Sequence, residues 1–467
     1  MFKFNLKRSF GIPVGGVIPS RRRPLATLLI IALNIAVYAI TSYENFFLAI
    51  SDYWVSAGGF VPSLITTPTQ LYRILASMFL HADLFHILFN MYFLYLFGRA
   101  VEDALGKERF LVLYFVSGLI ASIFHTAFSF LGGYAAYVIP AIGASGAISG
   151  VLGAYLILFP GTSLVFGWPF LFFPIFFRMK AAYYLIFWFA TQVIYGYTRT
   201  GGSTAVLAHA GGFIAGIALL LLVANKERTI QFKLARQTVF PTYMVFVPAP
   251  AKTNGLSHIT KMIITLILIP LIVGAAYASS GLSIQDDIKS IIIKYSLEGK
   301  PYIDYVGVKL SNIENQLATI SQDSTRILLN RLYAADLLYD HAKAGKSKSI
   351  SDQTIKVQIR MGRQLITLNL DIVHFAGNYD AEGFLIYGTG ELKTQIILID
   401  PYGRVSLTPN SVNYDFELTS QTVNLTYITQ YAGIISLVFT VAALFVATKK
   451  DKELTLIGEV SEESLPY

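Results

Sequence analysis

A serine and a histidine, the residue types of a nucleophile and its base, each stand near the start of a long apolar segment of this chain. Ser145 lies in the segment 141–159 and His209 in the segment 203–224. A serine hydroxyl becomes a useful nucleophile only when a base lies within hydrogen-bond reach, and in hydrocarbon both groups are costly without partners. The pair therefore predicts a serine hydrolase that works inside a membrane.

Two further polar side chains lie in the apolar segment 78–97. His86 and Asn90 are spaced i and i+4, so on a helix they share one face. Two donors on one face would point at the place where an oxyanion forms. His81, five residues before His86, is turned by about 140° around such a helix, so we expect it to face the loop or the lipid headgroups.

The composition is that of a membrane protein. Hydrophobic residues make up 54% of the 467 residues and charged residues only 14%, which is unlike a soluble domain of this length. The absence of cysteine excludes disulfides, a thiolate nucleophile and cysteine metal sites. Spans near the roughly 20 residues that a bilayer demands are expected at 25–42, 78–97, 109–130, 141–159, 181–197, 203–224, 260–279 and 429–447.

Basic residues next to these spans predict the topology. Arginines at 21–23 precede the first span and lysines at 449, 450 and 452 follow the last, so both termini are expected in the cytoplasm and the protein in the cell membrane. The net charge of +8 is assigned to this bias rather than to nucleic-acid binding. The second, fourth and sixth spans then run inward, and at 1.5 Å per residue Ser145 lies about 6 Å and His209 about 9 Å below the outer surface.

Over residues 25–224 the chain resembles the rhomboid family of intramembrane serine proteases. The family's motifs occur in chain order as His81, His86 and Asn90, then Gly143-Ala144-Ser145-Gly146, then Ala208-His209 followed by Gly212 and Gly216. Also similar are Tyr72-Arg73, Phe173-Pro174-Ile175, Trp188 and Gln192. A match spread over five segments is highly specific.

The resemblance implies a six-helix fold and a role for each site residue. Ser145 is implied as the nucleophile and His209 as the general base. His86, Asn90 and the backbone N–H of Ser145 are implied as oxyanion donors, and Gly143 as part of the substrate-binding positions. Neither a metal ion nor an organic cofactor is expected.

Three positions depart from the family pattern. Ser149 stands where the family usually has an aromatic residue packed against the base, which leaves the orientation of His209 open. An aromatic ring at 149 is expected either to raise the rate or, if the space is too small, to overpack the core. Thr204 replaces the first glycine of a Gly-x-x-x-Ala-His pattern, and Lys180 replaces a proline before the fifth helix. None of the three removes a catalytic atom.

Each piece alone has a plainer interpretation. The Gly-x-x-x-Gly pairs at 146–150 and 212–216 are packing motifs that are common in membrane helices, and a lone membrane histidine, such as His125, is often structural. The conjunction of nucleophile, base and donors at one depth favours a serine endopeptidase that cleaves transmembrane segments of other membrane proteins. The alternatives are a catalytically silent client-binding relative and a membrane transporter. A transporter would need acidic groups within its spans and repeated halves.

Beyond residue 224 the resemblance stops, and an all-α polytopic core with two extra helices and an extracytoplasmic α+β domain is expected. The expected partners are transmembrane substrates and the lipid bilayer; substrate identity and oligomeric state do not follow from the sequence. The expected segments are a cytoplasmic N-terminal segment (1–24), the six-helix core (25–224), a cytoplasmic linker (225–259), a seventh helix (260–279), the outer domain (280–428), an eighth helix (429–447) and a cytoplasmic tail (448–467).

The outer domain shows one helical pattern followed by strands. Apolar residues at helical spacing predict a helix around 311–344 with Gly345 as its stop. Alternating residues predict strands at 355–359, 365–370 and 395–399. Its role is open between substrate binding or regulation and a structural cap, and the six-helix unit 1–230 is expected to insert without it.

Overall fold

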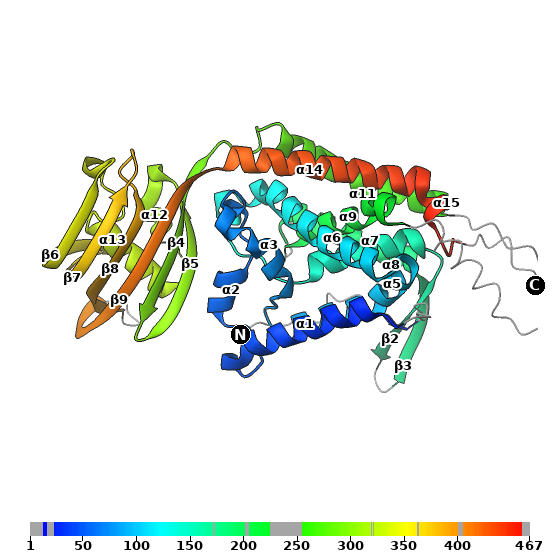
Figure 1. Cartoon of the computed structure of the whole chain (residues 1–467), viewed down its shortest axis with the longest axis horizontal. Coiled ribbons are helices and arrows are strands. Elements are labelled where there is room, and N and C mark those ends of the chain that lie inside the picture. Colours follow the sequence, from blue (N-terminus) through cyan, green and yellow to red (C-terminus); the bar gives the residue numbers. More distant parts are fainter. Residues whose placement is uncertain are drawn as a thin grey trace, which may run out of the picture.

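The computed structural model comprises a helical bundle with a β-sheet domain at one end (Figure 1). The expected N-terminal segment and the expected linker lie mostly outside the described residues, as do Thr204 and the end of the tail. The structure describes residues 13–15, 23–170, 173–200, 205–224, 255–318, 320, 322–361, 364–399 and 405–459.

Six stretches of helix in the described residues are long and apolar enough to cross a bilayer, so the chain is a multi-pass membrane protein. They are formed by α1 (Leu25–Ser42), α4 and α5 (Leu84–Phe93 and Arg99–Leu105), α6 (Lys107–Phe128), α9 (Val206–Val223), α11 (His258–Ser279) and α14 (Leu425–Phe445).

The other two expected spans are helices that do not meet the same criterion. Helix α7 (Ser145–Leu158) is apolar but has only 14 residues. Helix α8 (Ala181–Thr198) has 18 residues, but its tyrosines and Gln192 dilute the apolar ones. Helix α7 therefore falls short in length and α8 in apolar character.

Helices α7 and α9 lie so close that their backbones touch. A Cβ atom at Gly212 would lie 2.0 Å from the carbonyl oxygen of Gly146, and one at Gly216 would lie 1.8 Å from that of Gly150. Small residues allow such an approach between membrane helices. The first turns of α7 and α9 are thereby brought side by side.

A small sheet interrupts the expected all-α membrane part. Strands β2 (Ser163–Phe170) and β3 (Phe173–Lys180) form an antiparallel hairpin between α7 and α8, and β1 (Pro13–Gly15) pairs with β2. The all-α prediction is wrong here. The apolar run 164–177 contains no polar alternation, so the sequence pattern did not reveal strands.

The sheet domain, residues 287–424, holds six antiparallel strands in the order β5-β4-β9-β8-β7-β6. Two short helices, α12 (Ile313–Leu317) and α13 (Asp323–Ala334), share an aliphatic and aromatic core with the sheet. The strands are β4 (Asp287–Leu297), β5 (Lys300–Val308), β6 (Ser347–Met361), β7 (Gln364–Tyr379), β8 (Leu385–Ile399) and β9 (Val405–Asn424).

The single helix expected around 311–344 is wrong in its extent. The chain leaves α13 at Ala335, and Asp336 takes a left-handed conformation (φ 55°). Gly345 (φ 67°) follows a short 3-10 turn, His341–Lys343, rather than ending a helix. The three expected strands fall inside β6, β7 and β8.

Helices α11 and α14 pack on the six-helix unit rather than apart from it. The Tyr197 hydroxyl of α8 donates to the carbonyl of Pro270 in α11 at 2.5 Å. After α14, the backbone N–H groups of Leu456 and Ile457 donate to the carbonyl of Leu158 at the end of α7. The expectation of an independent unit 1–230 did not foresee these contacts.

Candidate active site

The structure brings Ser145 and His209 together at adjacent helix ends. Ser145 is the first residue of α7, and His209 lies in the first turn of α9. The Ser145 Oγ and the His209 Nε2 are 2.7 Å apart, within hydrogen-bond distance, and both side chains are half-buried. A serine hydroxyl that donates to an imidazole is the arrangement that allows proton removal during attack.

Helix α8 fixes the orientation of the imidazole. The Gln192 Oε1 lies 2.9 Å from the His209 Nδ1, while the Gln192 Nε2 donates to the Thr191 Oγ1 at 3.3 Å. Because the amide oxygen faces the ring, Nδ1 carries the hydrogen and Nε2 presents its lone pair to Ser145. The Trp188 ring lies 6.2 Å from the His209 ring, tilted by 31°.

Trp188 therefore supplies the aromatic face that Ser149 does not. Ser149 is buried, and its hydroxyl donates to the Ser145 carbonyl at 2.6 Å. Its Cβ would lie 3.3 Å from a Cβ built at Gly212, so α9 already occupies the space beside it. Of the two outcomes expected for an aromatic ring at 149, this packing favours the overpacked one. The sequence pointed to Trp188 only through the family resemblance and gave it no role.

His86 lies beside the nucleophile because residue 143 is glycine. A Cβ at Gly143 would lie 2.9 Å from both Cε1 and Nε2 of His86 and 3.4 Å from the Ser145 Oγ. Gly143 also has φ 126°, which a residue with a side chain rarely adopts. The Ala82 N–H donates to the His86 Nδ1 at 3.3 Å, so the ring hydrogen is on Nε2, which together with Cε1 lies nearest Gly143.

Helix α4 holds His86 and Asn90 on one face, as their spacing predicts. Asp83 caps the helix by accepting from the His86 N–H at 2.8 Å. Asn90 is 8% exposed, and its Nδ2 has no hydrogen-bond partner within the described part of the chain. A buried unpaired donor costs about 1–3 kcal/mol, so such a group in a native structure calls for a functional explanation.

The Ser145 backbone N–H is free of an intrahelical acceptor because Ser145 is the first residue of α7. The first four N–H groups of a helix have no intrahelical acceptor, and the helix dipole favours negative charge there. His86 and Ser145 both border Gly143, and Asn90 lies one helical turn beyond His86 on α4. A chemical step that develops negative charge near Ser145 would be stabilised by this arrangement.

His81 is not where the sequence analysis placed it. It is fully buried, not facing the loop or lipid headgroups, and its ring packs edge-on against His86 at 5.0 Å. The prediction failed because α4 begins at Leu84, so His81 precedes the helix and the 140° rotation does not apply. His81 instead packs against the His86 ring.

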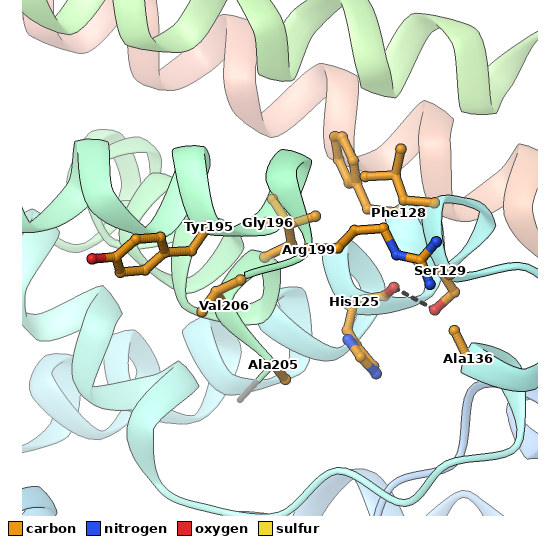
Figure 2. Close-up of a pocket in the computed structure, with 12 residues that line it drawn as sticks. His125, Phe128, Ser129, Ala136, Tyr195, Gly196, Arg199, Ala205 and Val206 are labelled. Atoms are coloured by element: carbon orange, nitrogen blue, oxygen red, sulfur yellow. Dashed lines mark hydrogen bonds between the residues drawn. The ribbon is translucent and has the colours of Figure 1, made fainter. Parts of the chain in front are cut away.

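A cavity of about 250 Å³ lies at the ends of α6, α8 and α9 (Figure 2). His125 lines it, and the Ser129 hydroxyl donates to the His125 carbonyl at 2.7 Å. Neither Ser145 nor His209 is among its lining residues. Within the described residues, no group of three or more His, Cys, Asp or Glu side chains is placed to hold a metal ion.

Comparisons with known proteins agree with the earlier resemblance. Residues 68–226 match the family model of the rhomboid domain. The chain is 30% identical over 136 residues to Rhomboid protein 1, mitochondrial, of Saccharomyces cerevisiae, which covers 29% of this chain and 37% of the relative. It is 35% identical over 134 residues to Rhomboid protease GluP of Bacillus subtilis, covering 29% of this chain and 24% of that one.

A third relative has a different name. Over 99 residues the chain is 34% identical to Inactive RHOMBOID-like protein 8 of Arabidopsis thaliana, covering 21% of this chain and 26% of the relative. The matched regions thus span between a quarter and two fifths of these relatives' lengths. Since one of these relatives is named a protease and another is named inactive, likeness alone does not decide activity.

Proposed function

Because the chain belongs to the rhomboid family, we propose that it is an intramembrane serine endopeptidase that uses Ser145 and His209 as a catalytic dyad. The observation that carries the proposal is the 2.7 Å contact from the Ser145 Oγ to the His209 Nε2, combined with the 2.9 Å contact from the His209 Nδ1 to Gln192. The two contacts together fix both the tautomer and the direction of the base.

In the proposed mechanism the Ser145 Oγ attacks the scissile carbonyl while its proton passes to the His209 Nε2. Gln192 accepts from Nδ1 throughout and steadies the imidazolium that forms. His209 then gives its proton to the leaving amine. Water, deprotonated by the same Nε2, releases the acyl group and restores the serine.

The carbonyl oxygen becomes negatively charged during attack, and three hydrogen-bond donors are proposed to stabilise this charge. The His86 Nε2–H, the Asn90 Nδ2 and the Ser145 N–H are the candidates, and the buried amide of Asn90 has no other acceptor within the described residues. Gly143 permits the His86 ring to approach. Preorganised donors of this kind typically supply about 3 kcal/mol each to the transition state.

The proposed substrates are transmembrane segments of other membrane proteins, because the dyad sits at helix ends within a multi-pass bundle. We place the protein in the cell membrane with both termini cytoplasmic, from the basic residues that follow α14. The proposed division is a protease core at 25–224, a linker at 225–259, two further membrane helices and an extracytoplasmic domain at 280–428. No metal or organic cofactor enters the mechanism.

The competing proposals are a silent client-binding relative and a transporter. A relative named as inactive shows that the silent class exists near this chain. The intact, hydrogen-bonded Ser145 and His209 argue against it here. Helices α1, α9, α11 and α14 contain no Asp or Glu, whereas a transporter usually needs intramembrane acidic groups.

The test is cleavage of a model transmembrane substrate by the purified full-length chain in liposomes. The wild-type protein is expected to cleave and Ser145→Ala is expected not to. Ser149→Ala is the matched control, because it makes the same change one turn further along α7 and removes only a hydroxyl that donates to the Ser145 carbonyl. Equal cleavage by the wild-type protein and Ser145→Ala would overturn the proposal.

A further inference from the structure

A buried arginine lies between the bundle and the sheet domain. Arg73, in the connection between α1 and α4, is only 3% exposed. Its Nη1 donates to the carbonyls of Ser56 at 2.8 Å and Gly59 at 3.0 Å, and its Nε donates to the Gln70 Oε1 at 2.7 Å. The guanidinium therefore fixes the turn that follows α2 (Asp52–Gly58).

The last partner of this arginine comes from the sheet domain. The Arg73 Nη2 donates to the hydroxyl of Tyr305 on β5, and the guanidinium carbon lies 4.4 Å from the centre of the Tyr305 ring. In Figure 1, α2 and α3 (Tyr72–Ala76) lie at the end of the bundle that faces this domain. Tyr305 is 7% exposed and packs with Val61 and Leu64. A desolvated cation is attracted electrostatically to the face of a tyrosine ring.

The turn held by Arg73 is paired with the segment that leads into the nucleophile. Phe60, next to Gly59, exchanges two backbone hydrogen bonds with Ala141, at 2.9 and 2.8 Å. A Cβ at Gly59 would lie 2.8 Å from Pro140, so the two segments are in contact. Within the segment 140–144, the Gly143 N–H also donates to the Ser77 carbonyl at 2.8 Å.

These contacts form a continuous path from the sheet domain to the site. Tyr305 touches Arg73, which holds Gly59, and the residue after Gly59 pairs with the segment that carries Gly143 and Ser145. Gly143 has φ 126° and borders the His86 ring, so this segment must keep an uncommon backbone conformation. Such conformations persist only where the surroundings impose them.

We propose that Tyr305 is a positioning residue, through which the sheet domain holds the segment 140–144 in the geometry that the dyad and the oxyanion donors need. The inference rests on the proposed protease function. Without the Tyr305 hydroxyl, one guanidinium N–H is left buried and unpaired, and the turn at Gly59 has a reason to rearrange. A shift of about 1 Å in a reacting group can lower a rate a hundredfold.

The first test measures kcat and KM of full-length variants on a soluble peptide substrate in liposomes. Tyr305→Ala is expected to lower kcat about tenfold or more with little change in KM, because the substrate site itself is untouched. Tyr305→Phe keeps the ring over Arg73 but loses the hydroxyl that accepts from it, so its kcat is expected to lie between those of Tyr305→Ala and the wild-type protein. Tyr302→Phe is the control, since Tyr302 lies in the same strand but stacks on Tyr295.

The second test separates positioning from simple docking. The chain has no cysteine, and the hydroxyl oxygens of Ser63 and Ser290 lie 3.3 Å apart across the interface. Replacing both serines by cysteine should allow a disulfide that fastens the sheet domain to the bundle. In this crosslinked background Tyr305→Ala is still expected to lower kcat.

Three results would overturn the inference. Wild-type kcat in Tyr305→Ala shows that the residue does not position the site. Full recovery of kcat on crosslinking shows that Tyr305 serves docking alone. If Tyr305→Ala does not fold, Tyr305→Phe decides, and wild-type kcat in that variant excludes a role for the hydroxyl. A wild-type protein that cleaves no substrate contradicts the protease proposal as well, so the two failures are distinguishable.

Discussion

The bundle and the sheet domain differ in the groups through which their elements pack. In the bundle, α7 and α9 meet through glycines, so backbone lies against backbone and polar groups are held between them. In the sheet domain, aliphatic and aromatic side chains fill the space between the sheet and two helices. Its buried Lys289 is neutralised by Asp380 and Glu382, at 2.6 and 2.5 Å.

The two regions also differ in how completely they satisfy buried polar groups. Among the described residues, the buried side-chain atoms without a hydrogen-bond partner include the Asn90 Nδ2 and the His81 Nε2, and none lies within 287–424. Native proteins leave few such groups, and those that remain call for a reason. The difference shows that buried polar groups are left unpaired in the bundle rather than in the described sheet domain, and two of them, in His81 and Asn90, lie just before or on α4 beside the candidate site.

The largest expected effect is loss of the dyad. Ser145→Ala and His209→Ala should each abolish cleavage, and the double variant should be no worse, because the two residues act as one unit. Thermal unfolding should change little, since each change removes side-chain atoms without breaking the glycine contacts. Initial rates on a membrane substrate, with unfolding curves as control, check this. Additive losses in the double variant would contradict a shared step.

The next largest effect is expected at the unpaired amide. Asn90→Ala should lower kcat about a hundredfold with little change in KM, because the donor acts mainly in the transition state. Asn413→Ala in the sheet domain is the matched control, since the Asn413 amide already donates to Glu391 at 2.8 Å and is exposed. A higher KM with unchanged kcat would place Asn90 in substrate binding instead.

Glycine substitutions compare the two kinds of packing directly. Gly216→Ala should cost about 1–3 kcal/mol of stability and lower the rate, because its Cβ would lie 1.8 Å from a backbone oxygen of α7. For Gly388→Ala in β8 the three nearest atoms all belong to the side chain of Leu385, which can move, so the loss should be smaller. The free energies of unfolding of the two variants, each compared with the wild-type value, measure these losses. Equal losses would show that backbone contact does not distinguish the bundle.

The smallest expected effect is a pH dependence at the edge of the sheet domain. Burial raises the pKa of Asp304 from 3.8 to about 6, a hydrogen bond from Thr325 lowers it and the charge of Asp52 raises it. The folded state therefore binds more protons between pH 3.8 and 6, so Asp304 makes the protein less stable as pH rises through this window. Asp304→Asn should raise the unfolding temperature at pH 7 and leave it unchanged near pH 4. A lower unfolding temperature of Asp304→Asn than of the wild-type protein at pH 7 would show that the ionised Asp304 carboxylate stabilises the fold.

The sequence predicted the residues that carry chemistry better than it predicted their supports. Motif order and depth paired Ser145 with His209, and the i, i+4 spacing put His86 and Asn90 on one face. The support by Trp188 and Gln192 depends on how α8 packs against α9, which no local pattern encodes. The error at His81 arose at a helix start, because Asp83 caps α4 and the helix begins at Leu84, six residues after the expected start of the span at 78.

The same limits apply to the rest of the fold. Strands with clear alternation, such as 365–370, were predicted, whereas the hairpin at 163–180 lacks alternation and was not. The contact between Arg73 and Tyr305 joins residues 232 positions apart, so only the folded chain reveals it. Long-range contacts of this kind determine whether the sheet domain affects the candidate active site.

The most direct test of the central claim is covalent trapping by a serine-reactive fluorophosphonate. The full-length protein in liposomes should gain one adduct, located on Ser145 by peptide mapping, because only this serine is hydrogen-bonded to His209 in the described structure. His209→Ala should prevent the labelling while the protein remains folded. An adduct on Ser149, or equal labelling with and without His209, would contradict the account.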